Sequence, residues 1–326
     1  MDLIVKNYLN SFEFDAPQRS ENMSVLPIIA GQNIGPEYLT LQEALDNGHL
    51  TVTEVDQAGS VPDLKVINNS QFYVLILDGQ ELVGAKQNRV LNTTVLVDKD
   101  TELTIPVSCT EQGRWSYSTE KFSESESFLP RSIQMSKMAS VSDSLRRMRS
   151  HRSNQSQVWN DINRYHREAG TASPTGAMID AYRSRENEIE DRLKLFEVSN
   201  LHNGCLVFIN DEVIGMDVLS RPEAYSKLSK KLLRSYAMEA IRTESQKGGQ
   251  VDIEKARQFI TEAQKCSEER FKSAGLGEDF RFDSQQIIGS ALIYIGYVMH
   301  TAFFNRGYEH TSDRMASFRH RRDFRR

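Results

Sequence analysis

The stretches GAKQNRVLNTT (84–94) and PVSCTEQGRW (106–115) decide how this chain is interpreted. They place many polar side chains among apolar, β-branched neighbours of the kind that form buried strands. Polar groups are costly to bury unless they find hydrogen-bonding partners. The pattern therefore predicts a site that holds a polar ligand, and its basic residues favour an anionic one. The predicted ligand-binding residues are Lys86, Gln87, Asn88, Arg89, Asn92, Gln112, Arg114 and Trp115.

These residue types suit a phosphorylated, nucleotide-like ligand. Lys and Arg neutralise phosphates, and Arg can grip them with two parallel hydrogen bonds. The flat face of Trp115 offers a stacking surface for a base. Two other interpretations stay open, in which the segment is an ordinary surface hairpin and Trp115 only covers an edge of the core. The phosphate contacts would come from Lys86, Arg89 and Arg114, and the contacts to ribose or base from Asn88, Asn92 and Gln112.

Two residues are candidates for catalysis. Glu111 is the candidate general base, because a carboxylate near a desolvated pocket can have its pKa moved into a useful range. Cys109 is a candidate nucleophile, but it follows Ile105 and Val107 in an alternating apolar row. A catalytic cysteine also needs a positioned base, and no histidine is close in sequence. An apolar core position is therefore the simpler interpretation of Cys109.

The order of predicted elements indicates an α+β protein, with an N-terminal mostly-β domain followed by a mixed helix/strand domain. Strands are predicted at 50–55, 71–77, 89–97 and 103–109. Thr40 and Glu43 have capping-box spacing, which predicts a helix at 40–47. The predicted divisions are a β-rich domain at 1–120, a serine-rich, locally basic linker at 121–156, an α+β domain at 157–305 and a basic tail at 306–326.

The second half predicts helices and two hairpins. Helical spacing of apolar residues covers 158–169, and Ser173-Pro174 is predicted to cap the next helix, which runs to 196. A hairpin at 205–219, a long helix from 222 and a helix from 252 through 271 follow. The uncharged run 287–304 is divided by Gly296, so it predicts a hairpin rather than a membrane span. His300 is interpreted as a core or edge histidine.

Charge and cysteine content limit the class of protein. The formal net charge of −5 argues against a protein built to coat nucleic acid. Three cysteines without a CxxC pair predict a reducing compartment, no disulfide framework and no metal site. The N-terminus lacks the features of a signal peptide, so a cytoplasmic location is expected. The basic cluster 146–152 is either a solvated surface or an anion-binding element.

The same residues resemble a known family. The runs LVGAKQNRVLNTTVLV and IPVSCTEQGRW, together with the segment from Asn203 to Ala237 and the final GSALIYIGYVMHTAFF, resemble the ARG and Rhodanese-Phosphatase-superfamily-associated protein domain. ARG denotes ADP-ribosyl glycohydrolase. The resemblance covers about residues 20–305 and implies a soluble, intracellular protein associated with NAD or ADP-ribose metabolism. The family offers no catalytic assignment that could be carried over.

The leading hypothesis is a protein that binds or senses an NAD- or ADP-ribose-type ligand. An enzyme of this kind would be a hydrolase acting on an ADP-ribose or NAD-derived substrate, and no cofactor is identified. The alternative is a non-enzymatic interaction or assembly protein that uses the helical segment and the basic tail. Further partner predictions are a homo-oligomer and a weak, salt-dependent nucleic-acid contact through the tail.

Overall fold

The computed structural model describes residues 1–31, 34–56, 60–243 and 251–307. Helices and strands are both abundant there, which confirms the α+β class. A nine-stranded sheet runs in the order β1 (Phe12–Phe14), β3 (Met23–Ala30), β13 (Gly204–Ile209), β14 (Glu212–Leu219), β18 (Tyr297–Asn305), β17 (Ile287–Tyr294), β16 (Glu278–Asp283) and β15 (Ser267–Lys272), with β2 (Gln18–Ser20) paired to β3.

Two smaller sheets form the β-rich part of the molecule. A six-stranded sheet has the order β12 (Phe122–Phe128), β8 (Gln80–Gly84), β9 (Arg89–Leu91), β11 (Thr101–Cys109), β6 (Asp63–Asn68) and β5 (Leu50–Glu54). A three-stranded sheet has the order β10 (Val95–Val97), β7 (Tyr73–Ile76) and β4 (Tyr38–Thr40). The β4–β7 pair is parallel, whereas the other strand pairs of the described residues are antiparallel.

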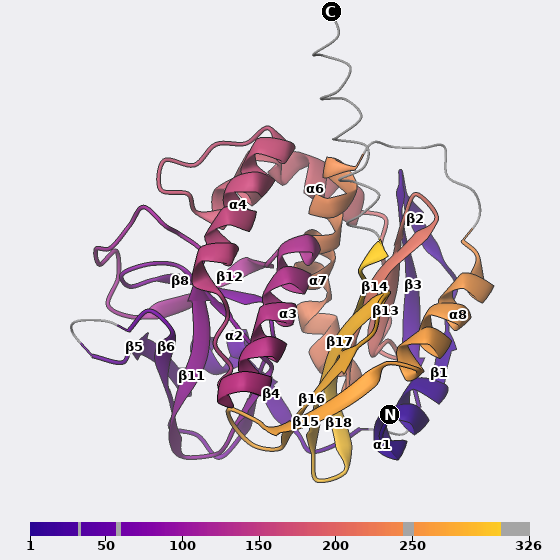
Figure 1. The fold of residues 1–326 in the computed structure, drawn as a ribbon, viewed down its shortest axis with the longest axis horizontal. Coiled ribbons are helices and arrows are strands. Elements are labelled where there is room, and N and C mark those ends of the chain that lie inside the picture. Colours follow the sequence, from indigo (N-terminus) through magenta and orange to yellow (C-terminus); the bar gives the residue numbers. More distant parts are fainter. Residues whose placement is uncertain (32–33, 57–59, 244–250, 308–326) are drawn as a thin grey trace, which may run out of the picture.

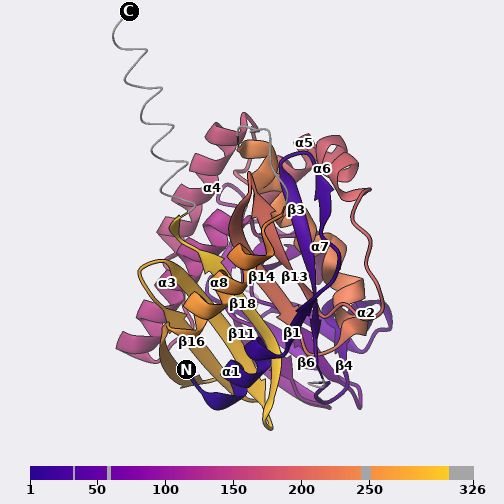
Figure 2. The ribbon, with the colours of Figure 1, turned by 90° about the vertical axis from the view of Figure 1, so that its right-hand side faces the viewer.

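Helices lie on both faces of the nine-stranded sheet, and α2 packs against the smaller sheets (Figure 1 and Figure 2). The helices of the described residues are α1 (Leu3–Asn10), α2 (Leu41–Asp46), α3 (Arg131–Met148), α4 (Gln155–Ala169), α5 (Met178–Ser184), α6 (Glu186–Leu193), α7 (Pro222–Arg242) and α8 (Ile253–Gln264). In Figure 1, α3 and α7 lie between the smaller sheets and the nine-stranded sheet. Figure 2 shows α1 and α8 on the opposite face of that sheet.

The central strand β13 explains why two cores form. Successive side chains of a strand point to opposite faces. Cys205 and Val207 therefore pack into the core that contains the apolar residues of α3 and α7. Leu206 and Phe208 pack into a second core with α1 and α8. A strand that is buried on both faces has a continuous run of apolar residues, and residues 205–209 of β13 form such a run.

Several local predictions are confirmed. The helix predicted at 40–47 is α2, with the capping box between Thr40 and Glu43 in place. The uncharged run near the C-terminus forms the β17–β18 hairpin, whose turn places Ile295 and Gly296 at φ angles of 44° and 85°. Among the described residues, no helix has both the length and the apolar character needed to span a membrane.

The predicted linker at 121–156 is wrong, because it contains β12 and α3. Some of its serines are buried donors rather than flexible spacers: Ser125 bonds Glu81, and Ser132 bonds Glu239. The predicted boundary between two domains does not follow the sheets either, since β3 pairs with the whole length of β13. Of the predicted basic tail at 306–326, residues 308–326 lie outside the described residues.

Three predicted elements are interrupted. The strand at 89–97 divides into β9 and β10, which belong to different sheets. The helix at 252–271 ends at Gln264, because residues 267–272 pair with β16 as an edge strand. The helix expected from Ser173 begins only at Met178, since Gly176 has a φ of 66° and Ser173 Oγ accepts from the backbone of Ala177.

Because β13 and β14 lie close together at Gly204, we expect that any side chain at this position destabilises the fold. A Cβ there would overlap the carbonyl oxygen of Asp217 and lie 2.7 Å from the Cα of Val218. Gly204→Ala should lower the free energy of unfolding by more than about 2 kcal/mol in urea unfolding experiments. Gly31→Ala is the control, because its Cβ would meet only Ser11 at 3.5 Å. Equal stabilities of the two variants would contradict the packing described.

Candidate functional site

The predicted motif is assembled around the guanidinium of Arg114. Its Nη1 donates to the carbonyls of Ala85 at 2.6 Å and Ser116 at 3.0 Å. Its Nη2 lies 2.6 Å from Glu111 Oε2 and donates to Asn88 Oδ1 at 3.1 Å. These bonds tie the β8–β9 connection to the loop after β11. Because its donors are used within the chain, Arg114 acts as a structural clamp here.

Three other predicted residues, Arg89, Gln112 and Asn92, have different surroundings. Arg89 is fully buried and pairs with Glu54 at 3.4 Å, so its charge is directed inward. Gln112 is exposed and accepts a bond from Asn163 through its side chain. Asn92 lies apart from the rest, where it donates to the carbonyl of His151 and accepts from Ser108. The structure thus brings together the residues at 86–89 and 111–115, but not Asn92.

Lys86 lies between two aromatic side chains. Its ammonium is 5.4 Å from the ring centroid of Trp115 and 5.2 Å from that of Tyr117. Trp115 is 48% exposed and Tyr117 is 52% exposed, whereas Lys86 is 9% exposed. The guanidinium carbon of Arg89 lies 5.7 Å from the Trp115 ring. Both cations therefore sit close to half-exposed rings, in the range of cation–π attraction.

Glu111 does not have the raised pKa expected of a general base. Burial raises its pKa, but hydrogen bonds from Arg114 and Thr175 outweigh that effect, and the net result is a lowered pKa. Thr175 Oγ1 donates to Oε1 at 2.9 Å, while Oε2 accepts from Arg114 and from the backbone of Asn88. This lowered pKa disfavours Glu111 as a general base that titrates near neutral pH.

Two buried carboxyls, Glu81 in β8 and Glu124 in β12, have raised pKa values, and Glu81 is the more deeply buried. It is 2% exposed and accepts hydrogen bonds from Thr110 at 2.7 Å and Ser125 at 3.3 Å. No cation forms an ion pair with it among the described residues. Burial, aided by the nearby charge of Glu111, raises the pKa of Glu81 to about 7. Sequence reasoning missed Glu81 because no strand was predicted at residues 80–84, where the structure has β8.

Cys109 has the properties of a structural thiol. It is fully buried, and burial raises its pKa to about 11. Its backbone is held by Gln155, which donates to its carbonyl at 2.9 Å and accepts from its amide at 2.7 Å. A thiol of this kind stays protonated at neutral pH and is a poor nucleophile. In the part of the chain that the structure covers, no group of three or more His, Cys, Asp or Glu side chains is placed to hold a metal ion.

Sequence reasoning missed a set of buried polar side chains between the nine-stranded sheet, α3 and the segment joining β9 to β10. We call this set the polar layer. It consists of Asp78, Thr93, Thr94, Arg131, Lys137, His151, Asp217, Asp279, Arg281 and His300. Lys137 pairs with Asp78, and Arg131 pairs with Asp217 at 3.2 Å. Buried charges of this density are a recurrent property of functional sites.

The polar layer explains why the predicted strand at 89–97 is interrupted. Thr93 Oγ1 donates to Asp279 at 2.9 Å, and Thr94 Oγ1 lies 2.8 Å from His300 Nδ1. Consecutive side chains thus turn toward the same layer, which a regular strand cannot do. The available signal was the charge of Asp279 and Arg281 at alternating positions of an aromatic strand. His300 was expected to be a core histidine, and it is 1% exposed.

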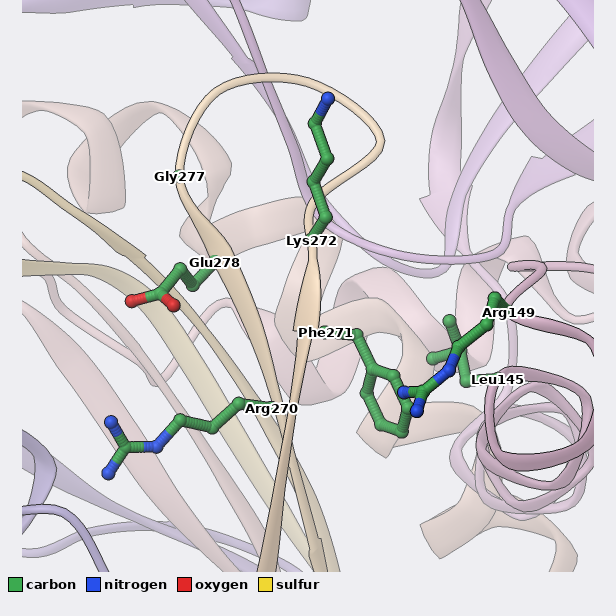
Figure 3. Close-up of a pocket in the computed structure, with 7 residues that line it drawn as sticks. All are labelled: Leu145, Arg149, Arg270, Phe271, Lys272, Gly277 and Glu278. Atoms are coloured by element: carbon green, nitrogen blue, oxygen red, sulfur yellow. The ribbon is translucent and has the colours of Figure 1, made fainter.

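The basic cluster at 146–152 borders a hollow of about 380 Å³ beside the β15–β16 hairpin. Figure 3 shows Arg149 next to Phe271, whereas Arg270 and Glu278 point to the other side of the hairpin. Arg146 is paired with Glu269 and Asp283. The charged groups of the hollow therefore do not converge on a single point.

The role of Arg114 predicts a large loss of stability when it is truncated. Arg114→Ala would leave the Glu111 carboxylate without its cation and several carbonyls without a donor. We expect a loss of about 2–4 kcal/mol in the free energy of unfolding. Arg114→Lys should recover little, because an ammonium lacks the planar fork. The control is Arg183→Ala, whose guanidinium is 70% exposed; a comparable loss there would refute the clamp.

Glu81 predicts a dependence of stability on pH. Below pH 4.5 the carboxyl is protonated in both the folded and unfolded states. As pH rises toward 7, only the unfolded state releases the proton, so Glu81 lowers the free energy of unfolding by an amount on the order of 3 kcal/mol. The stability of Glu81→Gln relative to the original protein should therefore increase from pH 4.5 to pH 7.5 and then level off.

The difference between the two stability curves is the decisive measurement, because a misfit of the glutamine would shift the variant by the same amount at every pH. Parallel curves would show that Glu81 does not keep its proton. The control for the loss of a carboxylate is Glu126→Gln, at an exposed position of β12.

Comparison with known proteins assigns the chain to a family. Searches of curated proteins and of solved structures returned no match. A model of the ARG and Rhodanese-Phosphatase-superfamily-associated Protein domain matches residues 11–304. That range contains the Arg114 clamp, Glu81 and every residue of the polar layer. The chain therefore belongs to the ARG and Rhodanese-Phosphatase-superfamily-associated Protein domain family.

Proposed function

We propose that this protein binds a phosphorylated, nucleotide-like metabolite of the NAD or ADP-ribose type. The observation that carries the proposal is the cluster of Lys86, Trp115 and Tyr117. Two half-exposed aromatic rings share one ammonium group at distances of 5.4 and 5.2 Å. A base would stack on the exposed ring surfaces, and the phosphates would approach the lysine.

Three cations lie around the rings, which favours an anionic ligand. Arg89 pairs with Glu54 and Arg114 pairs with Glu111, whereas Lys86 lies between the two rings. Charges held beneath aromatic rings are poorly screened by salt because water is partly excluded. The proposed roles are consequently unequal. Lys86 would contact the phosphates, while Arg89 and Arg114 would contribute a fixed field from within the fold.

The proposal is one of binding, and a reaction would need groups beyond the two predicted catalytic residues. Cys109 is a protonated, buried thiol, and both carboxylate oxygens of Glu111 already accept hydrogen bonds within the chain. The word ARG in the family's name, which denotes ADP-ribosyl glycohydrolase, motivates the choice of ligand class, and the exposed rings suit a ligand that contains a base.

The fluorescence of Trp115 provides a direct test. The chain has two tryptophans, and Trp159→Phe should be tolerated because the indole Nε1 of Trp159 has no partner. In this background we expect saturable quenching by ADP-ribose, NAD or AMP. Lys86→Gln should weaken binding about tenfold, which corresponds to the loss of one charge-assisted contact. Calorimetry with Trp115→Ala would give the contribution of stacking.

Lys99→Gln is the matched control, since Lys99 lies 4.7 Å from the ring centroid of Tyr73, away from the proposed site. It should leave the affinity unchanged. Absence of a saturable signal with every nucleotide, or equal affinity in the Lys86 and Lys99 variants, would refute the proposed site. Inorganic phosphate and adenosine, tested separately, would show whether the phosphate or the base supplies most of the affinity.

A further inference from the structure

Arg281 is the most under-satisfied cation of the polar layer. It is 1% exposed, and its Nη2 donates to Asp279 at 2.7 Å and to Thr93 Oγ1 at 2.9 Å. Its Nε and Nη1 are buried without any hydrogen-bond partner. A buried donor left unpaired costs about 1–3 kcal/mol, and more when it is charged. Among the described arginines, Arg281 alone has two such nitrogens.

The neighbours of Arg281 add positive charge rather than remove it. Lys137 is close enough for the charge of Arg281 to oppose its protonation, and its own carboxylate partner is Asp78. Among the described residues, the carboxylate that pairs with Arg281 is Asp279, which also accepts from Thr93 and lies 3.0 Å from His151 Nε2. One carboxylate oxygen thus contacts three polar groups, and Nε and Nη1 of Arg281 are left without an acceptor.

The register of the sheet places these groups on one face. Asp279 lies opposite Leu292, which lies opposite His300, so all three side chains point toward α3. Arg281 is two residues from Asp279 along β16 and shares that face. It lies opposite Ser290, a small residue in β17. The unpartnered nitrogens therefore belong to the interior between the nine-stranded sheet and α3.

We propose that this part of the polar layer is a second ligand site, in which a small oxyanion accepts from the unpartnered Nη1 of Arg281. An oxyanion such as phosphate or a carboxylate group supplies the acceptor that this nitrogen lacks, while Nε points to another edge of the guanidinium and needs an acceptor of its own, such as water. Thr93 contacts the same guanidinium, and Lys137 lies close enough for the two positive charges to interact. The site is separate from the Lys86–Trp115–Tyr117 cluster and does not depend on the function proposed above.

The ligand would enter from the side of His151. The side chain of His151 is 11% exposed, compared with 1–3% for Arg281 and Asp279. His151 follows Arg149 by two residues, and Asp279 follows Glu278, so both segments leading into the layer border the hollow shown in Figure 3. Arg149 and Lys272, which line that hollow, would attract an anion toward this side of the molecule.

Binding of inorganic phosphate to the full chain is the first test. Titration calorimetry at constant ionic strength, with chloride replacing phosphate, should give saturable binding. We expect Arg281→Gln to reduce phosphate affinity at least tenfold. The matched control is Arg234→Gln, which removes another buried arginine that pairs with carboxylates, in this case Glu186 and Glu190. This control should leave phosphate affinity unchanged, whatever it does to stability.

A second measurement does not depend on any variant being folded. Crystals of the unaltered protein soaked in tungstate should show an anomalous peak within hydrogen-bonding distance of Arg281. No peak at Arg281, or phosphate affinity that is equal in the Arg281 and Arg234 variants, would overturn the proposal and leave ordered water as the partner of these donors. Lys86→Gln should retain phosphate binding at Arg281, which separates this site from the nucleotide site.

Discussion

The buried ion pair between Arg131 and Asp217 is the interaction on which the rest of the structure depends. Arg131 begins α3, Asp217 lies in the middle of β14, and the two side chains are each 1% exposed. Tyr236 from α7 donates to the same carboxylate at 2.8 Å. Burial alone would raise the pKa of Asp217, but Arg131 and His300 lower it overall. Since an unpaired charge at this depth costs several kcal/mol, the sheet and both helices pack in one arrangement.

The same constraint positions the smaller sheets. His300, which is 3.6 Å from Asp217, contacts Thr94 in the segment between β9 and β10. Thr94 in turn accepts the backbone amide of Asp78, and Asp78 pairs with Lys137 of α3. A chain of polar contacts thus connects the nine-stranded sheet with the segment that carries the family motif. Polar groups specify orientation more strictly than apolar packing, because each donor must meet an acceptor at a fixed distance.

Elements with a regular apolar period could be predicted from the sequence, whereas the partners of buried charges could not. The α2 capping box and the β17–β18 hairpin depend on neighbours within a few residues. Glu81 depends instead on Thr110, which directly follows β11, and on Ser125 in β12. The serine-rich segment was interpreted as a linker because composition reports average exposure and cannot show that a hydroxyl has a buried acceptor. Of the predicted site, residues 86–89 and 111–115 lie close together, whereas Asn92 lies apart, and the sequence did not show that Arg89 and Arg114 pair with carboxylates of the chain itself.

Arg114 and Arg281 show why direction matters for function. Both are arginines close to a carboxylate, and only Arg114 stood out in the sequence, because it belongs to a dense polar motif. In the structure the nitrogens of Arg114 bond acceptors from the chain itself, so the motif mainly holds two segments together. Arg281 lies in β16, where charged and aromatic residues alternate and where no site was predicted from the sequence. Two of its nitrogens are unpartnered. A concentration of polar residues therefore identifies where a fold needs hydrogen bonds. The donors that remain unpartnered after those bonds are formed, as on Arg281, are the basis of the second ligand site that we propose.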